Sequence, residues 1–430
     1  MPFERGQVSF ARFSHAAGVS HVGAEQLDAL GESAFRATEI GAPPEVESGW
    51  VTGKHLNDTA FDQEKCAFLD DEVGHFALRI DTNRVPAELK RAIRAEHEAA
   101  VLEDSGASFL SRGMKREVKE LIDAALQNEL STGRHRRSRL TPVLWRPGVR
   151  RVLAASGAAN VAECLRDRWR STFEQPLEGV SAGRLAWEIV SERGRTREFE
   201  DARPTAFIAA PGSYVPRGDE EGGAWEANAS VPPIPWALSG PEPRDFFGNE
   251  FLLWLWHATE VGRGEIEANG ERYAVVLDGA LEMACAWGVS GTMTLKSEIG
   301  ETAPSRQAEA YEGLLSGKLP RRAGLTLAEG EDVWRLTLQA DRWLVTGCAL
   351  PELEEKFETP RQLVEWRFEQ VLRVDAALEA LFAAFLDERL SSRWEQTRKS
   401  IRQWIQQRRK GATAMVEVKQ PAPEAAATAG

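Results

Sequence analysis

The sequence is poor in cysteine and lacks long apolar runs. Its 430 residues include four cysteines, which lie far apart in the chain: Cys66, Cys164, Cys285 and Cys348. A C-x-x-C element, a zinc ribbon or a disulfide framework needs closer spacing, so we expect reduced thiols. The strongest apolar run, residues 251–256, has six residues, where a membrane helix needs about 20. The start, MPFERGQVSFARF, lacks the apolar core of a signal peptide, and we expect a cytoplasmic protein without membrane contact.

Motifs for common cofactors and nucleophiles are also lacking. Two Gly-Lys pairs, in residues 49–54 and 313–318, have three residues between the glycines where a Walker loop has four. Neither lysine is followed by Ser or Thr, which would bind magnesium. The seven histidines form no H-x-x-x-H or H-x-E pattern, and no G-x-S-x-G elbow is present. We therefore expect no cofactor, no metal site and no catalytic residue.

Acidic residues are absent from one long segment of an acidic protein. The formal net charge is −13, yet residues 130–162 contain no Asp or Glu in 33 positions. This segment carries +7, which leaves −20 for the remainder. An acidic protein's solvated surface normally intersperses charges, so we interpret the segment as one whose compensating anion comes from outside the chain. The arginine fork suits phosphate oxygens. The arginines are Arg134, Arg136, Arg137, Arg139, Arg146, Arg150 and Arg151.

A helix expected over about residues 110–130 carries a second basic cluster. Its apolar residues fall in one stripe at helical spacing: Leu110, Met114, Val118, Leu121, Ile122 and Ala125. Outside the stripe lie four clustered basic residues: Arg112, Lys115, Arg116 and Lys119. An ordinary solvated face remains the alternative to a binding surface.

The remaining pattern predicts both helices and strands. Pro86 predicts the start of a helix that ends near residue 102. Helices are further expected near 161–169, 182–190 and 359–410, and strands near 74–80, 271–296, 334–338 and 343–350. The chain then divides into an N-terminal α+β region (1–190), a Pro/Gly-rich insertion or linker (191–249), a β-rich region (250–352), a helical extension (353–410) and a disordered tail (411–430).

An ordered series of short matches resembles the bacterial recombination-associated RdgC family. The series comprises Ser48-Gly49-Trp50-Val51, Arg84-Val85-Pro86, the segment from Arg112 to Glu120, Leu144-Trp145, Leu281-Glu282, Gly291, Lys296, Glu309-Ala310, Gly317-Lys318 and Trp343-Leu344. It covers roughly residues 1–190 and 250–352. No single motif is diagnostic, and the resemblance rests on the order of the series.

The resemblance implies an α+β subunit with mixed antiparallel sheets and flanking helices. Two such subunits join head-to-head and tail-to-tail into a ring, whose positively charged hole holds double-stranded DNA. Binding is largely independent of sequence, limits access of a RecA-type recombinase and places the protein at the nucleoid. By position, Lys115, Arg116 and Lys119 match the family's basic helix, and Lys296 matches a basic position facing DNA.

The chain departs from the family in two places. The Arg-rich residues 134–139 replace the family's P-R-A-F-S stretch, so the ring contact made by that Phe is in doubt. The insertion and the C-terminal helical extension exceed the usual family length.

Two further hypotheses belong to other functional classes. One is a metal-dependent exonuclease, for which Asp278, Glu282, Lys296 and Glu298 are the residues to consider. Such a quartet is expected by chance in a chain this rich in acids. The other is an interaction scaffold, in which the basic segment docks an acidic protein.

Overall fold

The computed structural model describes residues 2–16, 18–38, 45–208, 242–262, 264–287, 291–297, 302–353 and 357–418. Its strands form a large antiparallel sheet of 13 strands with flanking helices, which confirms the expected α+β class. The chain divides into two compact units. Unit 1 contains residues 13–179, and unit 2 contains residues 2–12 together with the chain from residue 180 onward. The strand β1 (Val8–His15) supplies residues to both units.

Unit 1 is built on four strands in the order β6–β5–β4–β2, flanked by helices. The strands are β2 (Val46–Val51), β4 (Val73–Asn83), β5 (Arg136–Arg146) and β6 (Arg151–Ala154), with the short β3 (Ala67–Phe68) paired to β4 and β7 (Leu177–Gly179) paired to the second half of β1. The helices are α1 (Ala24–Glu32), α2 (Gln63–Cys66), α3 (Ala87–Ser105), α4 (Arg112–Ser131) and α5 (Ala159–Phe173).

Aromatic side chains fill the space between the sheet and α5. Trp145 of β5 packs edge-on against Trp169 of α5, with ring centroids 5.3 Å apart. Its Nε1–H donates a hydrogen bond to Nε2 of His15 over 3.0 Å. Trp50 of β2 is fully buried and packs edge-on against Phe76 at 5.1 Å. The Leu144-Trp145 segment therefore lies in a buried strand.

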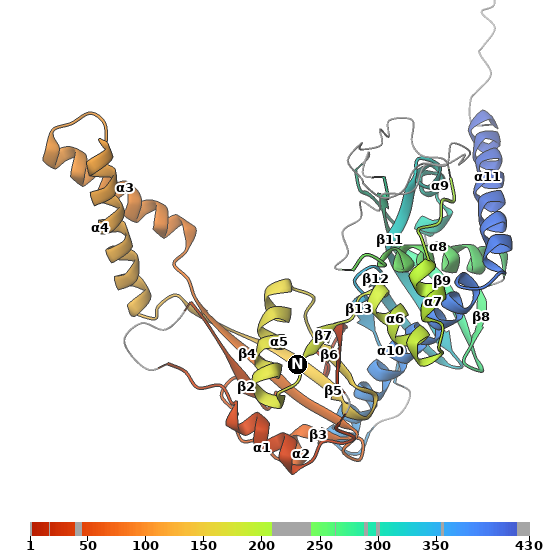
Figure 1. Ribbon diagram of the computed structural model, residues 1–430, viewed down its shortest axis with the longest axis horizontal. Helices are drawn as coiled ribbons and strands as arrows, with labels where there is room; N and C mark the ends of the chain where they lie inside the picture. The colour runs from red at the N-terminus through yellow and green to blue at the C-terminus, as the bar shows by residue number, and fades with distance from the viewer. Residues whose placement is uncertain are drawn as a thin grey trace, which may run out of the picture. The chain divides into compact units, whose positions relative to one another are not determined.

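Helices α3 and α4 form a hairpin that stands away from the strands of unit 1 (Figure 1). The polypeptide enters α3 through Pro86 and leaves it through Gly106, whose φ of 61° is the left-handed value that glycine tolerates best. Ser111 caps α4, because its side chain accepts a hydrogen bond from the Met114 backbone N–H over 3.3 Å. Both helices were predicted from sequence to within a few residues of their ends.

Unit 2 joins six strands in the order β10–β9–β11–β12–β13–β1. They are β9 (Glu271–Cys285), β10 (Met293–Lys296), β11 (Lys318–Glu329), β12 (Asp332–Gln339), β13 (Leu344–Ala349) and the first half of β1, with β8 (Glu265–Ala268) paired to β9. The helices are α6 (Ala182–Glu192), α7 (Thr196–Asp201), α8 (Phe246–Val261), α9 (Ala308–Leu315), α10 (Pro360–Arg389) and α11 (Trp394–Val418), and two short 3-10 turns, η1 (Pro147–Val149) in unit 1 and η2 (Pro304–Arg306) in unit 2, complete the described elements.

The core of unit 2 forms around α8, in which every residue from Phe246 to His257 is buried. This helix contains the apolar run noted in the sequence. In the described part of the chain, no helix has both the length and the apolar content required to cross a bilayer.

The described elements refine several sequence boundaries. The expected insertion at 191–249 contains α7 and the start of α8, while residues 209–241 lie outside the described residues. Helix α6, expected within the N-terminal region, belongs to unit 2. Helix α11 ends at Val418, past the expected boundary at 410, and residues 419–430 of the expected tail lie outside the described residues.

Candidate nucleic-acid interface

The four basic residues of α4 share one exposed face of the hairpin. Their spacing of three, one and three residues repeats along one side of a helix, and all four side chains are exposed. Arg116 pairs with Glu120 over 3.2 Å on the same helix. Among the described residues, Arg112, Lys115 and Lys119 have no carboxylate within ion-pairing distance.

The position of these cations on α4 is unfavourable for the isolated helix. The first turn contains no acidic residue, and Arg112 is its first residue. Cations at a helix N-terminus oppose the helix dipole, whose positive end lies there. The basic face therefore does not stabilise α4 by itself. Four acidic residues of α4, three of them beyond Lys119, balance its charge, so the excess of positive charge is confined to its first two turns.

Strand alternation divides the arginines of β5 between two faces of the sheet. Arg136 points to the face that carries Asp81 of β4 and Glu47 of β2. Its Nε donates to Oδ2 of Asp81 over 2.9 Å, and its Nη2 pairs with Glu47. Arg79 also binds Asp81 through two hydrogen bonds, of 2.9 and 2.8 Å. Residues 130–162 contain no acidic residue, but neighbouring strands supply the carboxylates that neutralise Arg136.

The environment of Asp81 keeps its carboxylate ionised. Burial by itself would raise the pKa of Asp81, but hydrogen bonds from Arg79, Ser138 and Arg136, with the charge of Arg79, outweigh it and lower the pKa. Arg136 is therefore part of a structural ion network.

Arg137 and Arg139 lie on the opposite face of β5 and are exposed. Arg139 is in register with Ile80 of β4, which is in register with Ser48 of β2. Arg168 of α5 donates to the side-chain hydroxyl of Ser48 over 3.4 Å. Trp50, on the same face of β2 as Ser48, donates from Nε1 to Thr172 of α5 over 2.7 Å. Arg137 and Arg139 therefore share the α5 side of the sheet. Neither residue, nor the exposed Arg134, has a carboxylate partner among the described residues.

The end of β5 that carries these arginines is joined to the base of α4. Asn83 of β4 donates from Nδ2 to the backbone oxygen of Leu130 over 2.9 Å. Nε2 of His135, just before β5, lies 3.1 Å from Oε2 of Glu129 in the last turn of α4. These contacts place the exposed arginines of β5 beside the last turn of α4, while Arg112, the first residue of α4, lies about 29 Å along the helix from Ser131.

The other predicted arginines lie at the far end of β5. At about 3.3 Å per residue, Arg146 is about 33 Å along the strand from Arg136. Arg146 is 3.8 Å from Glu72. Arg150 follows the 3-10 turn η1, with a φ of 58°, and Arg151 begins β6. The structure therefore does not gather the seven arginines into a single cluster.

Lys296 and the carboxylates considered for a nuclease lie in unit 2. Lys296 is exposed on β10 and is in register with Ala280 of β9, so it lies on the same face as Glu282. Asp278 accepts a hydrogen bond from the Thr326 hydroxyl over 2.7 Å, and Glu298 lies outside the described residues. In the described ranges, no three His, Cys, Asp or Glu side chains converge as metal ligands.

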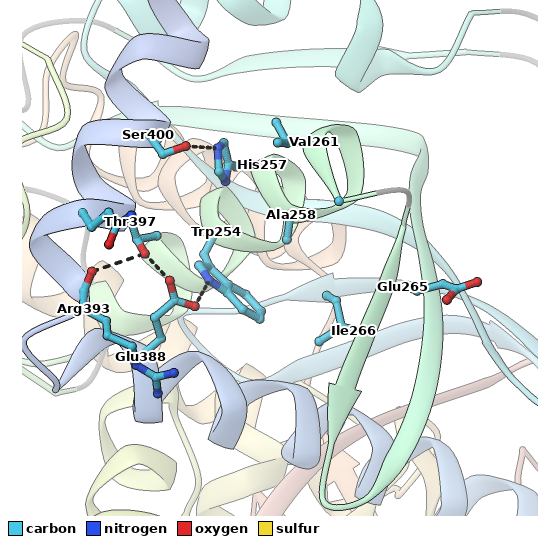
Figure 2. A pocket seen from close by; sticks show the side chains of 12 residues that line it. Trp254, His257, Ala258, Val261, Glu265, Ile266, Glu388, Arg393, Thr397 and Ser400 are labelled. Atoms are coloured by element: carbon cyan, nitrogen blue, oxygen red, sulfur yellow. Dashed lines mark hydrogen bonds between the residues drawn. The ribbon is translucent and has the colours of Figure 1, made fainter.

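A pocket of about 560 Å³ in unit 2 was not indicated by sequence motifs. Figure 2 shows Trp254 and His257 of α8 facing Thr397 and Ser400 of α11. Nε2 of His257 is 3.1 Å from the Ser400 hydroxyl, and Glu388 accepts a hydrogen bond from Trp254 Nε1 over 3.0 Å. Trp254 and His257 are three residues apart on α8, and Thr397 and Ser400 are three residues apart on α11. More than 100 positions separate these two helices in the sequence.

The Ser–His pair of this pocket lacks other parts of a hydrolase site. Burial lowers the pKa of His257, and the charges of Glu388 and Glu260 only partly oppose this, so the imidazole is neutral at pH 7. Ser400 lies within α11, where the backbone N–H groups are engaged in the helix and cannot form an oxyanion hole. The helix that carries Ser400 therefore does not itself supply an oxyanion hole for this Ser–His pair.

No family model and no curated protein matches the chain.

Proposed function

We propose that this protein binds double-stranded DNA without reading its base sequence. The observation that carries the proposal is the presence of two exposed basic clusters in unit 1. One consists of Arg112, Lys115, Arg116 and Lys119 on α4, and the other of Arg134, Arg137 and Arg139 at β5. Most of these side chains have no carboxylate partner among the described residues, so an external polyanion would relieve their mutual repulsion.

Phosphate neutralisation accounts for such binding without catalysis. Each cation that meets a phosphate releases a condensed counterion, and affinity falls as salt rises. Contact with about six phosphates gives a slope of about −5 in a plot of log K against log salt concentration. The exposed cations of α4 lie in its first two turns, whereas its Gln127 and Asn128 lie in its last two turns, so the cationic part of the helix is suited to phosphate contact.

The resemblance to the RdgC family extends this proposal. It supports a homodimeric ring around the duplex and a role in recombination, in which occupied DNA is less accessible to a RecA-type recombinase. Light scattering tests the dimer, and a recombinase-loading assay on coated DNA tests the competition.

The DNA-binding proposal is tested with two unrelated duplexes of equal length and two salt concentrations. We expect similar affinities for both duplexes and a steep loss with salt. Arg137→Glu combined with Arg139→Glu should reduce affinity at least tenfold. The matched control replaces Arg197 and Arg272, exposed arginines of unit 2, with Glu. Binding that is insensitive to salt, or equal losses in both double variants, contradicts the proposal.

The same samples test the exonuclease hypothesis. The DNA-binding proposal predicts that the duplex is recovered intact after long incubation with magnesium or manganese. Nucleotide release that disappears in Asp278→Ala would favour the nuclease instead.

A further inference from the structure

The tip of the α3–α4 hairpin presents an aromatic side chain to solvent. Phe109 is 86% exposed, the largest fraction among the large hydrophobic side chains that the structure describes as exposed; Val261 follows at 61%. Burial of a Phe side chain stabilises a folded protein, and at Phe109 this stabilisation is largely absent. Single exposed apolar residues are common, so its surroundings decide whether this one has a role.

The connection that holds Phe109 is short and capped at both ends. Gly106 ends α3, and its N–H donates to the Glu103 oxygen over 3.3 Å. The backbone N–H of Ala107 donates to the Ser105 hydroxyl over 3.4 Å, and Ser111 caps α4. These bonds fix the path of the chain on either side of Phe109, so the ring stays at the end of the hairpin.

The aromatic tip adjoins the basic face of α4. Arg112 is three residues beyond Phe109, and Lys119 is seven residues further, about 10 Å along the helix axis. The first two turns of α4, next to the tip, carry four cations against one carboxylate, Glu117. This local excess of positive charge favours a nucleic acid, rather than an apolar protein surface, as the occupant of the site around Phe109.

We propose that Phe109 is a wedge that stacks on a base where the DNA stack is interrupted, an inference that rests on the proposed DNA binding. Aromatic rings stack on bases without sequence preference. Insertion into a continuous duplex costs the free energy of unstacking a base step, and this cost is least where a base is already unpaired. Phe109 therefore directs the protein to bulges and mismatches, while the cations of α4 supply affinity for any duplex.

The test compares two fluorescent duplexes that differ by one bulged base, at two salt concentrations. We expect wild-type protein to bind the bulged duplex about tenfold more tightly. Phe109→Ala should abolish this preference and leave the affinity and salt slope for the continuous duplex unchanged. Phe109→Trp, which keeps an aromatic ring, should retain the preference. Val149→Ala is the matched control, because Val149 is an exposed apolar residue of the same unit.

The outcomes separate the wedge from the proposed function. Salt-dependent binding to both duplexes without a preference overturns the wedge alone, as does a preference that survives Phe109→Ala. A change from dimer to monomer in Phe109→Ala, measured by light scattering, assigns the residue to a contact between copies and also overturns the wedge. The absence of salt-dependent binding to either duplex overturns the proposed function and the wedge together.

Discussion

Nε of Arg136 lies 2.9 Å from Oδ2 of Asp81, on the neighbouring strand, while the adjacent Arg137 faces the other side of the sheet. This relationship separates two roles within one run of arginines. Arg136 belongs to a network with Asp81, Arg79 and Glu47 that holds β2, β4 and β5 together. Arg137 is exposed and available to a ligand.

Arg136 and Arg137 therefore make a matched pair of variants. Arg136→Ala should lower the free energy of unfolding by about 1.5–3 kcal/mol, because it removes hydrogen bonds to buried carboxylates. Arg137→Ala should change it by less than about 0.5 kcal/mol but weaken DNA binding. Chemical denaturation and binding anisotropy measure the two effects. Equal losses of unfolding free energy in both variants would contradict the assignment of Arg136 to the ion network and of Arg137 to DNA contact.

The charges of α4 should act through the salt dependence of DNA binding. Lys115→Ala and Lys119→Ala should each reduce the magnitude of the log–log salt slope by about 1, with similar losses for unrelated sequences. Titrations at four salt concentrations provide the slope. Arg197→Ala, an exposed arginine of α7, is the control and should leave it unchanged. A loss confined to one DNA sequence would indicate base readout and contradict phosphate contact.

Gly49 should be intolerant of a side chain. A Cβ at this position would lie 2.4 Å from the Cα of Phe35, whose N–H donates to the Trp50 oxygen over 2.9 Å. Gly49→Ala must push this backbone away from β2, and we expect a loss of about 1–3 kcal/mol in unfolding free energy. Gly113→Ala is the control, because Gly113 has only a distant neighbour, the Ser111 hydroxyl at 4.0 Å. Thermal denaturation of the two variants is the measurement, and equal melting temperatures would contradict the close approach.

Stability should fall as the pH drops below about 6.5. Burial, with a smaller contribution from the charge of Lys54, lowers the pKa of His75 to about 3. Between these values the unfolded chain binds a proton that the folded chain does not, so acid favours unfolding. At pH 5 this amounts to about 2 kcal/mol for His75. Unfolding free energies at pH 7 and pH 5 measure the effect, and His75→Gln should reduce the difference. An undiminished pH dependence in His75→Gln would show that His75 is protonated in the folded chain.

The sequence allowed prediction of elements whose signals are local. Pro86 and the helical spacing of apolar residues from Leu110 to Ala125 predicted α3 and α4, and alternation predicted β12 and β13. The charge count from 130 to 162 could not show that Arg136 meets Glu47, because that contact spans 89 positions. The His257–Ser400 contact, which spans 143 positions, was hidden for the same reason. Phe109 sits in a short connection, where neither periodicity nor composition signals exposure.

The membership of β1 in both units has a consequence for how the chain acquires its structure. The first half of β1 pairs with β13, and Val8 is in register with Cys348. In the chain, β1 precedes β13 by more than 300 residues. Until β13 pairs with it, the Val8–Arg12 segment has an unpaired edge, which exposes it to pairing with other chains. A fragment that begins at residue 180 would leave β13 without this neighbour, so we expect excised unit 2 to aggregate unless residues 2–12 are restored.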